Sequence, residues 1–292
     1  ELMKMGEPGV PEMNAYIEEV LKEGETLGFD GRVVSVGEGE GYAAIAGKKN
    51  AKVNYQVDLI DEIWEDRPVL SEEPAFNLDV KYAGETVASK LVRIREEMKE
   101  AGTNVHVVST IDDICWTLNI RGNDIDFFPL VLSYGIITMD SFELYIDERK
   151  LDDKLKAKLA KDGVNLHPYN DIYEDVKKFG SDVVAMIDPG KLNYALFNNI
   201  PENVKTVEKR NPAILMKAIK NPVEIENIRK AQIKDSVAHV RFMKWLKENV
   251  GKMRITEMSA SDKLDELRAE MGNFIRPSFE PISSFGEHGA IV

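Results

Sequence analysis

The hydrophobic and polar positions of the N-terminal part alternate between strand-like and helix-like spacing. The pattern predicts a helix over 13–21, a strand over 31–36, a helix over 41–46, a strand over 51–55 and a helix over 59–64. These strands are too few for a whole sheet. The pattern therefore indicates part of an α/β domain.

A break in periodicity follows at residues 65–80. This stretch contains two prolines, several acidic residues and few periodic apolar positions. Such composition is typical of a linker between domains.

A second and longer alternation of strands and helices runs from residue 84 to residue 208. Strands are predicted over 104–109, 129–137, 142–146, 164–168, 182–188 and 203–208, and helices over 84–101, 111–121, 148–162, 170–179 and 191–198. Strands separated by helices predict a mainly parallel α/β sheet, in which 129–137 and 142–146 are joined closely enough to pair with each other.

The pattern changes again at Asn211. Two long helices are predicted over 212–250, with a bend at Asn221–Pro222, and over 256–271, before an extended stretch over 273–292. The last residues form an apolar strand pattern that stops abruptly, and the first residue is not Met, so both ends are expected to be cut. The predicted organisation is a partial α/β domain over 1–70, a second α/β domain over 71–210 and an incomplete third domain over 211–292.

Composition and charge narrow the classes of function. The 292 residues are 43% hydrophobic and 30% charged with a net charge of −13, as in a globular protein whose acidic surface disfavours nucleic acid. No apolar run approaches the roughly 20 residues that cross a bilayer, so no membrane partner is expected. The single cysteine, Cys115, cannot form an internal disulfide, which favours a reducing compartment and predicts a cytoplasmic protein.

Three acidic or glycine-rich motifs are each better explained by local structure than by chemistry. The GEGEG stretch at 37–41 lacks the glycine spacing of a phosphate loop and carries two repelling glutamates, so a flexible turn is expected. Asp112 and Asp113 are expected to complement the positive end of a helix. The stretch 123–126 is expected to be a loop ordered by its own Asx hydrogen bonds.

The four histidines, His106, His167, His239 and His288, are scattered along the chain without the spacing of metal ligands. Only His288, beside glycines in the extended tail, is a candidate for a functional role. The residues by themselves therefore contain no complete catalytic constellation.

The segment KAIKNPVEIENIRKA at 217–231 resembles the opening of the pita-bread fold that aminopeptidase P, prolidase and creatinase share. The segments VSTIDDICWTLNIRGND at 108–124 and TEMSASDKLDELR at 256–268 are similar to the middle and catalytic domains of the three-domain Xaa-Pro aminopeptidases. The resemblance implies an α/β fold: two creatinase-N-terminal-like domains, the first partial, followed by the truncated start of a pita-bread α+β domain.

The resemblance also implies a metal-dependent aminopeptidase that removes the N-terminal residue from peptides with proline at the second position. In that family two divalent metal ions, commonly manganese, activate a bridging hydroxide. Their five ligands would follow Val292, so no metal ligand, catalytic residue or activity is expected within this chain. A homodimer is expected for the full-length protein.

The resemblance implies substrate-binding residues, but no metal ligands, within this chain. Phe279 matches a position near the pocket for the residue before proline, although core packing explains a phenylalanine equally well. Gly289 and Ile291 match a strand that lines the cleft, and His288 precedes that strand. Arg121 and Gly122 match the middle domain, where they are expected to end a helix, with Gly122 as a left-handed cap.

Two alternatives stay open. The first is a non-catalytic pita-bread binding protein that lacks the metal ligands, which the sequence downstream of Val292 would decide. The second is a creatinase-type hydrolase, whose two-domain build does not account for the α/β unit before residue 65.

Overall fold

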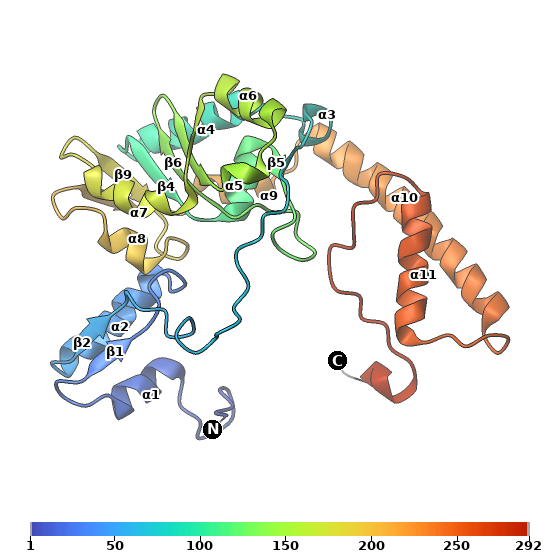
Figure 1. Cartoon of the computed structure of the whole chain (residues 1–292), viewed down its shortest axis with the longest axis horizontal. Coiled ribbons are helices and arrows are strands. Elements are labelled where there is room, and N and C mark those ends of the chain that lie inside the picture. Colours follow the sequence, from blue (N-terminus) through green and yellow to red (C-terminus); the bar gives the residue numbers. More distant parts are fainter. Residues whose placement is uncertain (1, 291–292) are drawn as a thin grey trace.

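The structure, a computed structural model, describes residues 2–290 and is built around a six-stranded sheet (Figure 1). The strand order is β10-β9-β4-β6-β7-β8. The strands are β4 (Val105–Val108), β6 (Ser133–Thr138), β7 (Phe142–Ile146), β8 (Val164–His167), β9 (Val184–Ile187) and β10 (Lys205–Glu208).

The sheet is mainly parallel, as predicted, with one reversed strand. Strands β10, β9 and β4 run parallel to one another and β7 pairs parallel to β8, whereas β6 is antiparallel to both β4 and β7. The antiparallel pairs arise because β6 and β7 form the predicted hairpin with a turn too short for a crossover helix. The predicted α/β class and the mainly parallel sheet are both confirmed, and β6 is the strand of this sheet that runs in the opposite direction.

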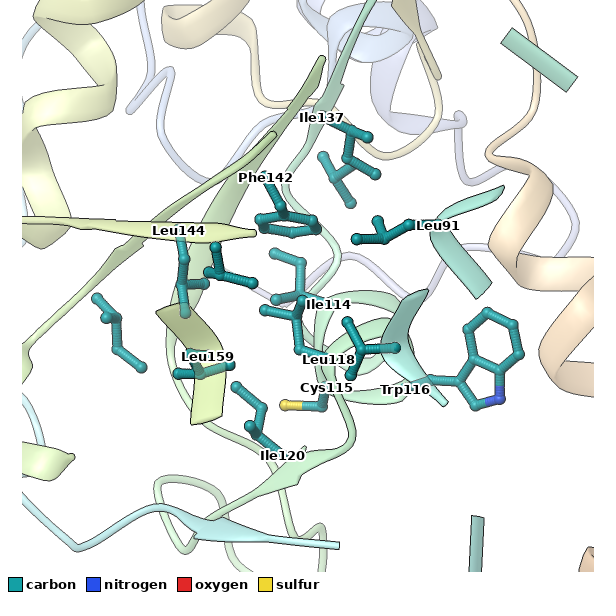
Figure 2. Packing of buried hydrophobic residues seen from close by; sticks show 14 of the residues in the cluster. Leu91, Ile114, Cys115, Trp116, Leu118, Ile120, Ile137, Phe142, Leu144 and Leu159 are labelled. Carbon is teal, nitrogen blue, oxygen red and sulfur yellow. The ribbon is translucent and has the colours of Figure 1, made fainter. Parts of the chain in front are cut away.

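Helices cover both faces of this sheet. One face carries α4 (Val87–Glu100), α5 (Ile111–Leu118) and α6 (Asp153–Lys161), whose apolar side chains form one core with Phe142 and Leu144 of β7 (Figure 2). The other face carries α7 (Ile172–Asp175) and α8 (Tyr194–Asn198), in a second core that includes Tyr145. Phe142, Leu144 and Tyr145 divide between the faces because successive strand residues point to opposite sides. Three short 3-10 turns complete this part: η1 (Glu148–Lys150), η2 (Tyr169–Asp171) and η3 (Val176–Lys178).

A smaller unit precedes the sheet. Helices α1 (Met13–Val20) and α2 (Val36–Lys48) pack on the two-stranded parallel sheet of β1 (Thr26–Gly28) and β2 (Lys52–Asn54). Its core is small, consisting of Leu21, Ile45 and Ala46 with a few partly buried neighbours. Residues 59–64, predicted as a helix, form turns instead.

The predicted strand at 31–36 is also wrong, because this segment docks the small unit onto the sheet domain. The Val36 N–H donates to Leu192 O at 2.9 Å, and the Tyr194 N–H donates to Val34 O at 2.9 Å. Val36 is fully buried in the second core. Ser35 caps α2 in a capping box with Glu38, so the GEGEG stretch opens a helix rather than forming a turn.

The predicted linker crosses from this unit to the sheet domain, as the cyan trace in Figure 1 shows. It contains no helix or strand before β3 (Phe76–Asn77), which pairs antiparallel with β5 (Ile120–Arg121). The short helix α3 (Val80–Ala83) follows.

Helix α5 ends earlier than the sequence pattern predicts. Asn119, at φ 52°, is the left-handed cap in place of Gly122. Glycine at position 122 has a different reason: the chain packs so closely there that a Cβ would lie 2.5 Å from Val131 Cγ2. Arg121 belongs to β5, and its guanidinium donates to the carbonyls of Cys115 and Ile120 at 2.9 and 2.8 Å.

The C-terminal part leaves the sheet domain as helices. They are α9 (Pro212–Ala218), α10 (Pro222–Asn249), α11 (Glu257–Glu270) and a terminal 3-10 turn η4 (Gly286–Ala290). The predicted bend is a complete break: Asn221 caps α10 with Pro222 in its first turn. Helices α10 and α11 lie side by side (Figure 1). Where a terminal strand was predicted, residues 286–290 form η4 instead. Across the described residues, no helix is long and apolar enough to span a membrane.

Candidate functional site

A cavity of about 480 Å³ opens between α10, α11 and the loop that follows α11. Ionic contacts hold its walls together. Arg268 Nε donates to Asp235 Oδ1 at 2.8 Å, which joins the two helices, and Lys234 Nζ donates to Gly272 O at 3.1 Å. The loop reverses at Gly272 and Asn273, which both adopt positive φ angles. The cavity thus has two rigid helical walls and one wall made of irregular chain.

Phe279, the sequence candidate for the pocket of the residue before proline, lines this cavity. Its side chain is 74% exposed and belongs to none of the hydrophobic cores of the described residues. Phe274 and Met271 line the same cavity, together with the two loop prolines, Pro277 and Pro281. An exposed aromatic ring at the edge of a cavity is available to an apolar ligand group.

His288 and Gly289 lie elsewhere, in η4, and do not line that cavity. His288 Nδ1 lies 3.0 Å from Glu257 Oε1 at the start of α11, and the Phe285 N–H donates to the same oxygen at 2.6 Å. These contacts hold the pKa of Glu257 below its usual value, with the Phe285 hydrogen bond as the larger cause. Gly289 has open space around its Cα, and Ile291 falls outside the described residues.

Sequence reasoning missed Arg276, which lines the same cavity as Phe279. Its guanidinium donates to Gly122 O at 3.1 Å and also contacts Asn123 Oδ1. The residue thereby connects the loop after α11 to the sheet domain, 154 residues earlier in the chain. No local pattern in the sequence signals a contact of that range.

A second cavity, of about 510 Å³, lies between the first turns of α10 and the sheet domain. Arg121, Trp116 and Glu224 line it, and burial lowers the pKa of Arg121. Asn221 Nδ2 donates to Ala83 O at 2.8 Å, and Asn227 Nδ2 to Lys81 O at 3.0 Å, so α10 is anchored to α3. The structure places Arg121 at this junction and not at the cavity that Phe279 lines.

The acidic pair lies in the first turn of α5, as expected, and it has an additional role. Asp113 is buried and accepts from Thr110 Oγ1 at 2.6 Å, Asn211 Nδ2 at 2.9 Å and Lys217 Nζ at 2.7 Å. Asp112 also pairs with Lys217. The aspartates therefore attach α9 to the sheet domain by charge, a contact that spans about a hundred residues of sequence.

The histidines have separate surroundings. His106 is buried with its ring nitrogens 3.1 Å from Met186 O and 3.2 Å from Asn211 Oδ1, while His167 contacts Glu143 and His239 contacts Asp235. Among residues 2–290, no group of three or more His, Cys, Asp or Glu side chains is arranged to hold a metal ion. The residues present there do not fit a two-metal centre.

Comparison with known families decides the class of the chain. The model of the creatinase/prolidase N-terminal domain matches residues 66–224, which is more than half of the chain. The chain belongs to the creatinase/prolidase N-terminal domain family. Residues 226–292 match metallopeptidase family M24, so the cavity that Phe279 lines falls within the M24-like part of this creatinase-family chain.

Relatives with similarity along the whole chain carry aminopeptidase names. The chain is 34% identical over 312 residues to a probable Xaa-Pro aminopeptidase P of Sordaria macrospora and 33% identical over 299 residues to Xaa-Pro aminopeptidase app-1 of Caenorhabditis elegans. All of the chain is aligned, against 50% and 48% of these proteins. The chain spans about half the length of the curated relatives it matches.

A solved structure repeats the likeness in three dimensions. The crystal structure of X-prolyl aminopeptidase from C. elegans, described as a cytosolic enzyme with a di-nuclear active site, superposes with a TM-score of 0.89 at 30% identity. The superposition covers 96% of this chain and 46% of that one. The fold of this creatinase-family chain is thus that of slightly less than half of the C. elegans enzyme.

Proposed function

We propose that this chain is the front part of a metal-dependent aminopeptidase that removes the N-terminal residue from peptides with proline at the second position. The supporting observation is that the M24-like helices α10 and α11 follow a creatinase-like domain in one chain, in the arrangement that superposes on the C. elegans X-prolyl aminopeptidase. Fold alone does not specify chemistry. The proposal rests on this likeness along the whole chain together with the exposed aromatic residue in the cavity.

The proposed division is a partial creatinase-like domain over 1–70, a second one over 71–210 and the start of the pita-bread domain over 211–292. The linker between the small unit and the sheet supports the first boundary. The change from strand β10 to helix α9 at Asn211, which caps α9, supports the second.

On the substrate side, Phe279 is proposed to contact the residue before proline. His288, Gly289 and Ile291 are proposed to line the approach for the peptide. Phe279 carries the firmest support, because its ring is exposed at the rim of a cavity with rigid helical walls.

Two divalent metal ions, with manganese as the expected metal, are proposed as cofactors of the complete protein. When bound they would supply a nucleophilic hydroxide and neutralise the developing oxyanion. Since the described residues do not fit such a centre, no catalytic step is assigned to them. A cytoplasmic location and a homodimer are part of the same proposal.

The test is to express the complete open reading frame that contains this sequence and to assay two peptides. One has proline at the second position and its partner has alanine there. Hydrolysis of the proline peptide alone, lost on chelation and restored by manganese, is expected. Metal-independent binding without hydrolysis of either peptide would favour the non-catalytic alternative.

A variant pair tests the substrate side in the same protein. Phe279→Ala is expected to raise KM for the proline peptide, because it removes an apolar wall at the rim of the cavity. Phe285→Ala is the matched control, since Phe285 is also a highly exposed phenylalanine, at 86% against 74% for Phe279, and does not line the cavity. Equal effects from the two substitutions would remove the reason for assigning Phe279 to the substrate.

A further inference from the structure

In the sheet domain, the chain leaves two neighbouring parallel strands toward opposite faces of the sheet, and the proposed function does not use this feature. Strands β4 and β9 are parallel neighbours. The chain leaves β4 toward α5, which packs in the first core, and leaves β9 toward α8, which packs in the second core on the opposite face. The loops after these two strands therefore diverge. In α/β sheets, such divergence opens a crevice at the carboxyl ends of the strands, where ligands bind.

A cavity of about 420 Å³ lies in this place. Three neighbouring parallel strands each contribute to its lining: Thr110 follows β4, Asp188 follows β9 and Arg210 follows β10. Helix α9 closes the cavity. The full lining is Thr110, Asp112, Asp113, Asp188, Lys191, Arg210, Ile214 and Lys217.

The carboxylates of the cavity already have partners. Asp113 accepts from Thr110, Asn211 and Lys217, as described above. Asp188 accepts from the Asn211 N–H at 2.9 Å and from the Gly190 N–H at 3.2 Å. These acceptors satisfy groups of the protein itself.

Two cations of the cavity differ from the carboxylates in this respect. Arg210 and Lys191 are exposed, and within residues 2–290 neither side chain makes a hydrogen bond or an ion pair. Both residues line the cavity, and their side-chain donors have no acceptor among the described residues. A guanidinium presents two parallel N–H groups that match the two oxygens of a carboxylate, and an ammonium adds a point charge beside it.

We propose that this cavity binds a small molecule through its carboxylate group, with Arg210 and Lys191 as the binding residues. Charge selects the class of ligand. Three aspartates balance the three cations of the lining, so the cavity is formally neutral before binding. A carboxylate then adds one negative charge, whereas a phosphate dianion adds nearly two beside Asp112 and Asp188. The repulsion disfavours phosphate.

This inference is independent of the peptidase proposal, because the cavity belongs to the sheet domain and to α9. Its test uses the ¹⁵N-labelled chain and nuclear magnetic resonance, with sodium acetate as the probe at constant ionic strength. Saturable shifts are expected in the backbone amides of 109–112, 188, 190–191 and 210–211. A matched titration with inorganic phosphate is expected to give weaker binding.

Four substitutions sharpen the test. Arg210→Gln and Lys191→Gln are each expected to weaken acetate binding about tenfold, because each removes a charge-assisted hydrogen bond. Arg254→Gln and Lys205→Gln make the same changes of charge at exposed positions away from the cavity and are expected to leave binding unchanged. Unchanged dispersion of the amide spectrum verifies that each variant is folded.

The absence of saturable shifts with acetate would overturn the proposal. Equal losses in all four variants would do the same, since they would indicate a general effect of charge. Tighter binding of phosphate than of acetate would refute the assignment to a carboxylate ligand.

Discussion

Lys150 and Asp124 form a fully buried ion pair, which allows a sharp prediction of stability. Their side chains are 2% and 1% exposed, and Lys150 Nζ lies 2.6 Å from Asp124 Oδ2. The same oxygen accepts from the Leu132 N–H at 2.7 Å. Asp124 Oδ1 is buried and has no hydrogen-bond partner within the described residues. The carboxylate therefore depends on Lys150 for most of its compensation.

Replacing Lys150 by Met keeps the aliphatic bulk and leaves the Asp124 charge buried without a counter-ion. Breaking a buried pair in this way costs about 3–5 kcal/mol, a large share of the roughly 5–15 kcal/mol that stabilises a typical domain. The matched control is Lys156→Met. Lys156 pairs with Glu148 at 3.1 Å on the surface, where an ion pair contributes about 0–1 kcal/mol.

The assay is urea unfolding followed by far-UV circular dichroism, with the free energy taken from the midpoint and slope. Lys150→Met is expected to lower the midpoint far more than Lys156→Met does. Adding Asp124→Asn to Lys150→Met is expected to recover most of the loss, because the amide removes the buried charge and its oxygen can still accept from Leu132. If the two lysine variants lost the same free energy, or if Asp124→Asn gave no recovery, the account of the buried pair would be refuted.

Three further predictions concern packing and protonation. Gly39→Ala is expected to lower the thermal midpoint, because its Cβ would overlap the ring of Tyr194. Gly41→Ala is the control in the same helix: its Cβ would meet nothing within 4 Å, so this variant is expected to raise the free energy of unfolding by about 0.5–1 kcal/mol. A loss of stability in both variants would contradict this account. Burial raises the pKa of Cys115 to about 11, so a thiol reagent at pH 8 is expected to react only after unfolding in urea, and fast reaction with the native chain would argue against the buried position. Burial lowers the pKa of Lys90 to about 8 from its ordinary 10.5, so this residue binds more protons in the unfolded chain between these values. The stability of the native sequence relative to Lys90→Met is therefore expected to rise with pH across that window, and a constant difference would contradict the shift.

Local pattern predicted most of the helices. The helix predicted over 84–101 is α4, and its apolar stripe of Val87, Leu91, Ile94 and Met98 is buried in the first core. Pro222 after Asn221 marked the break between α9 and α10. These signals succeed because a helix places residues three and four apart on one face, and because caps and prolines act within a few residues.

The same logic failed where a segment packs against a distant partner. Residues 31–36 have the apolar pattern of a strand, yet they form hydrogen bonds to α8 and the residues just before it. Val36 is buried in a core built mainly from residues beyond 105. The glycines at 37–41 suggested a turn, yet they open α2, and Gly39 lets that helix approach Tyr194 closely. Neither partner is visible within the local sequence.

The candidate site divides in the same way. The residues of the sequence alone determined that a creatinase-like domain precedes an M24-like start, because motif spacing is a local property. Only the tertiary structure separated Phe279 from His288, attached Arg276 to Gly122 and brought Asp113 to Lys217. Those contacts join positions about a hundred or more residues apart or lie in an irregular loop. They are set by how the helices pack on the sheet, for which the periodicity of a short segment contains no information.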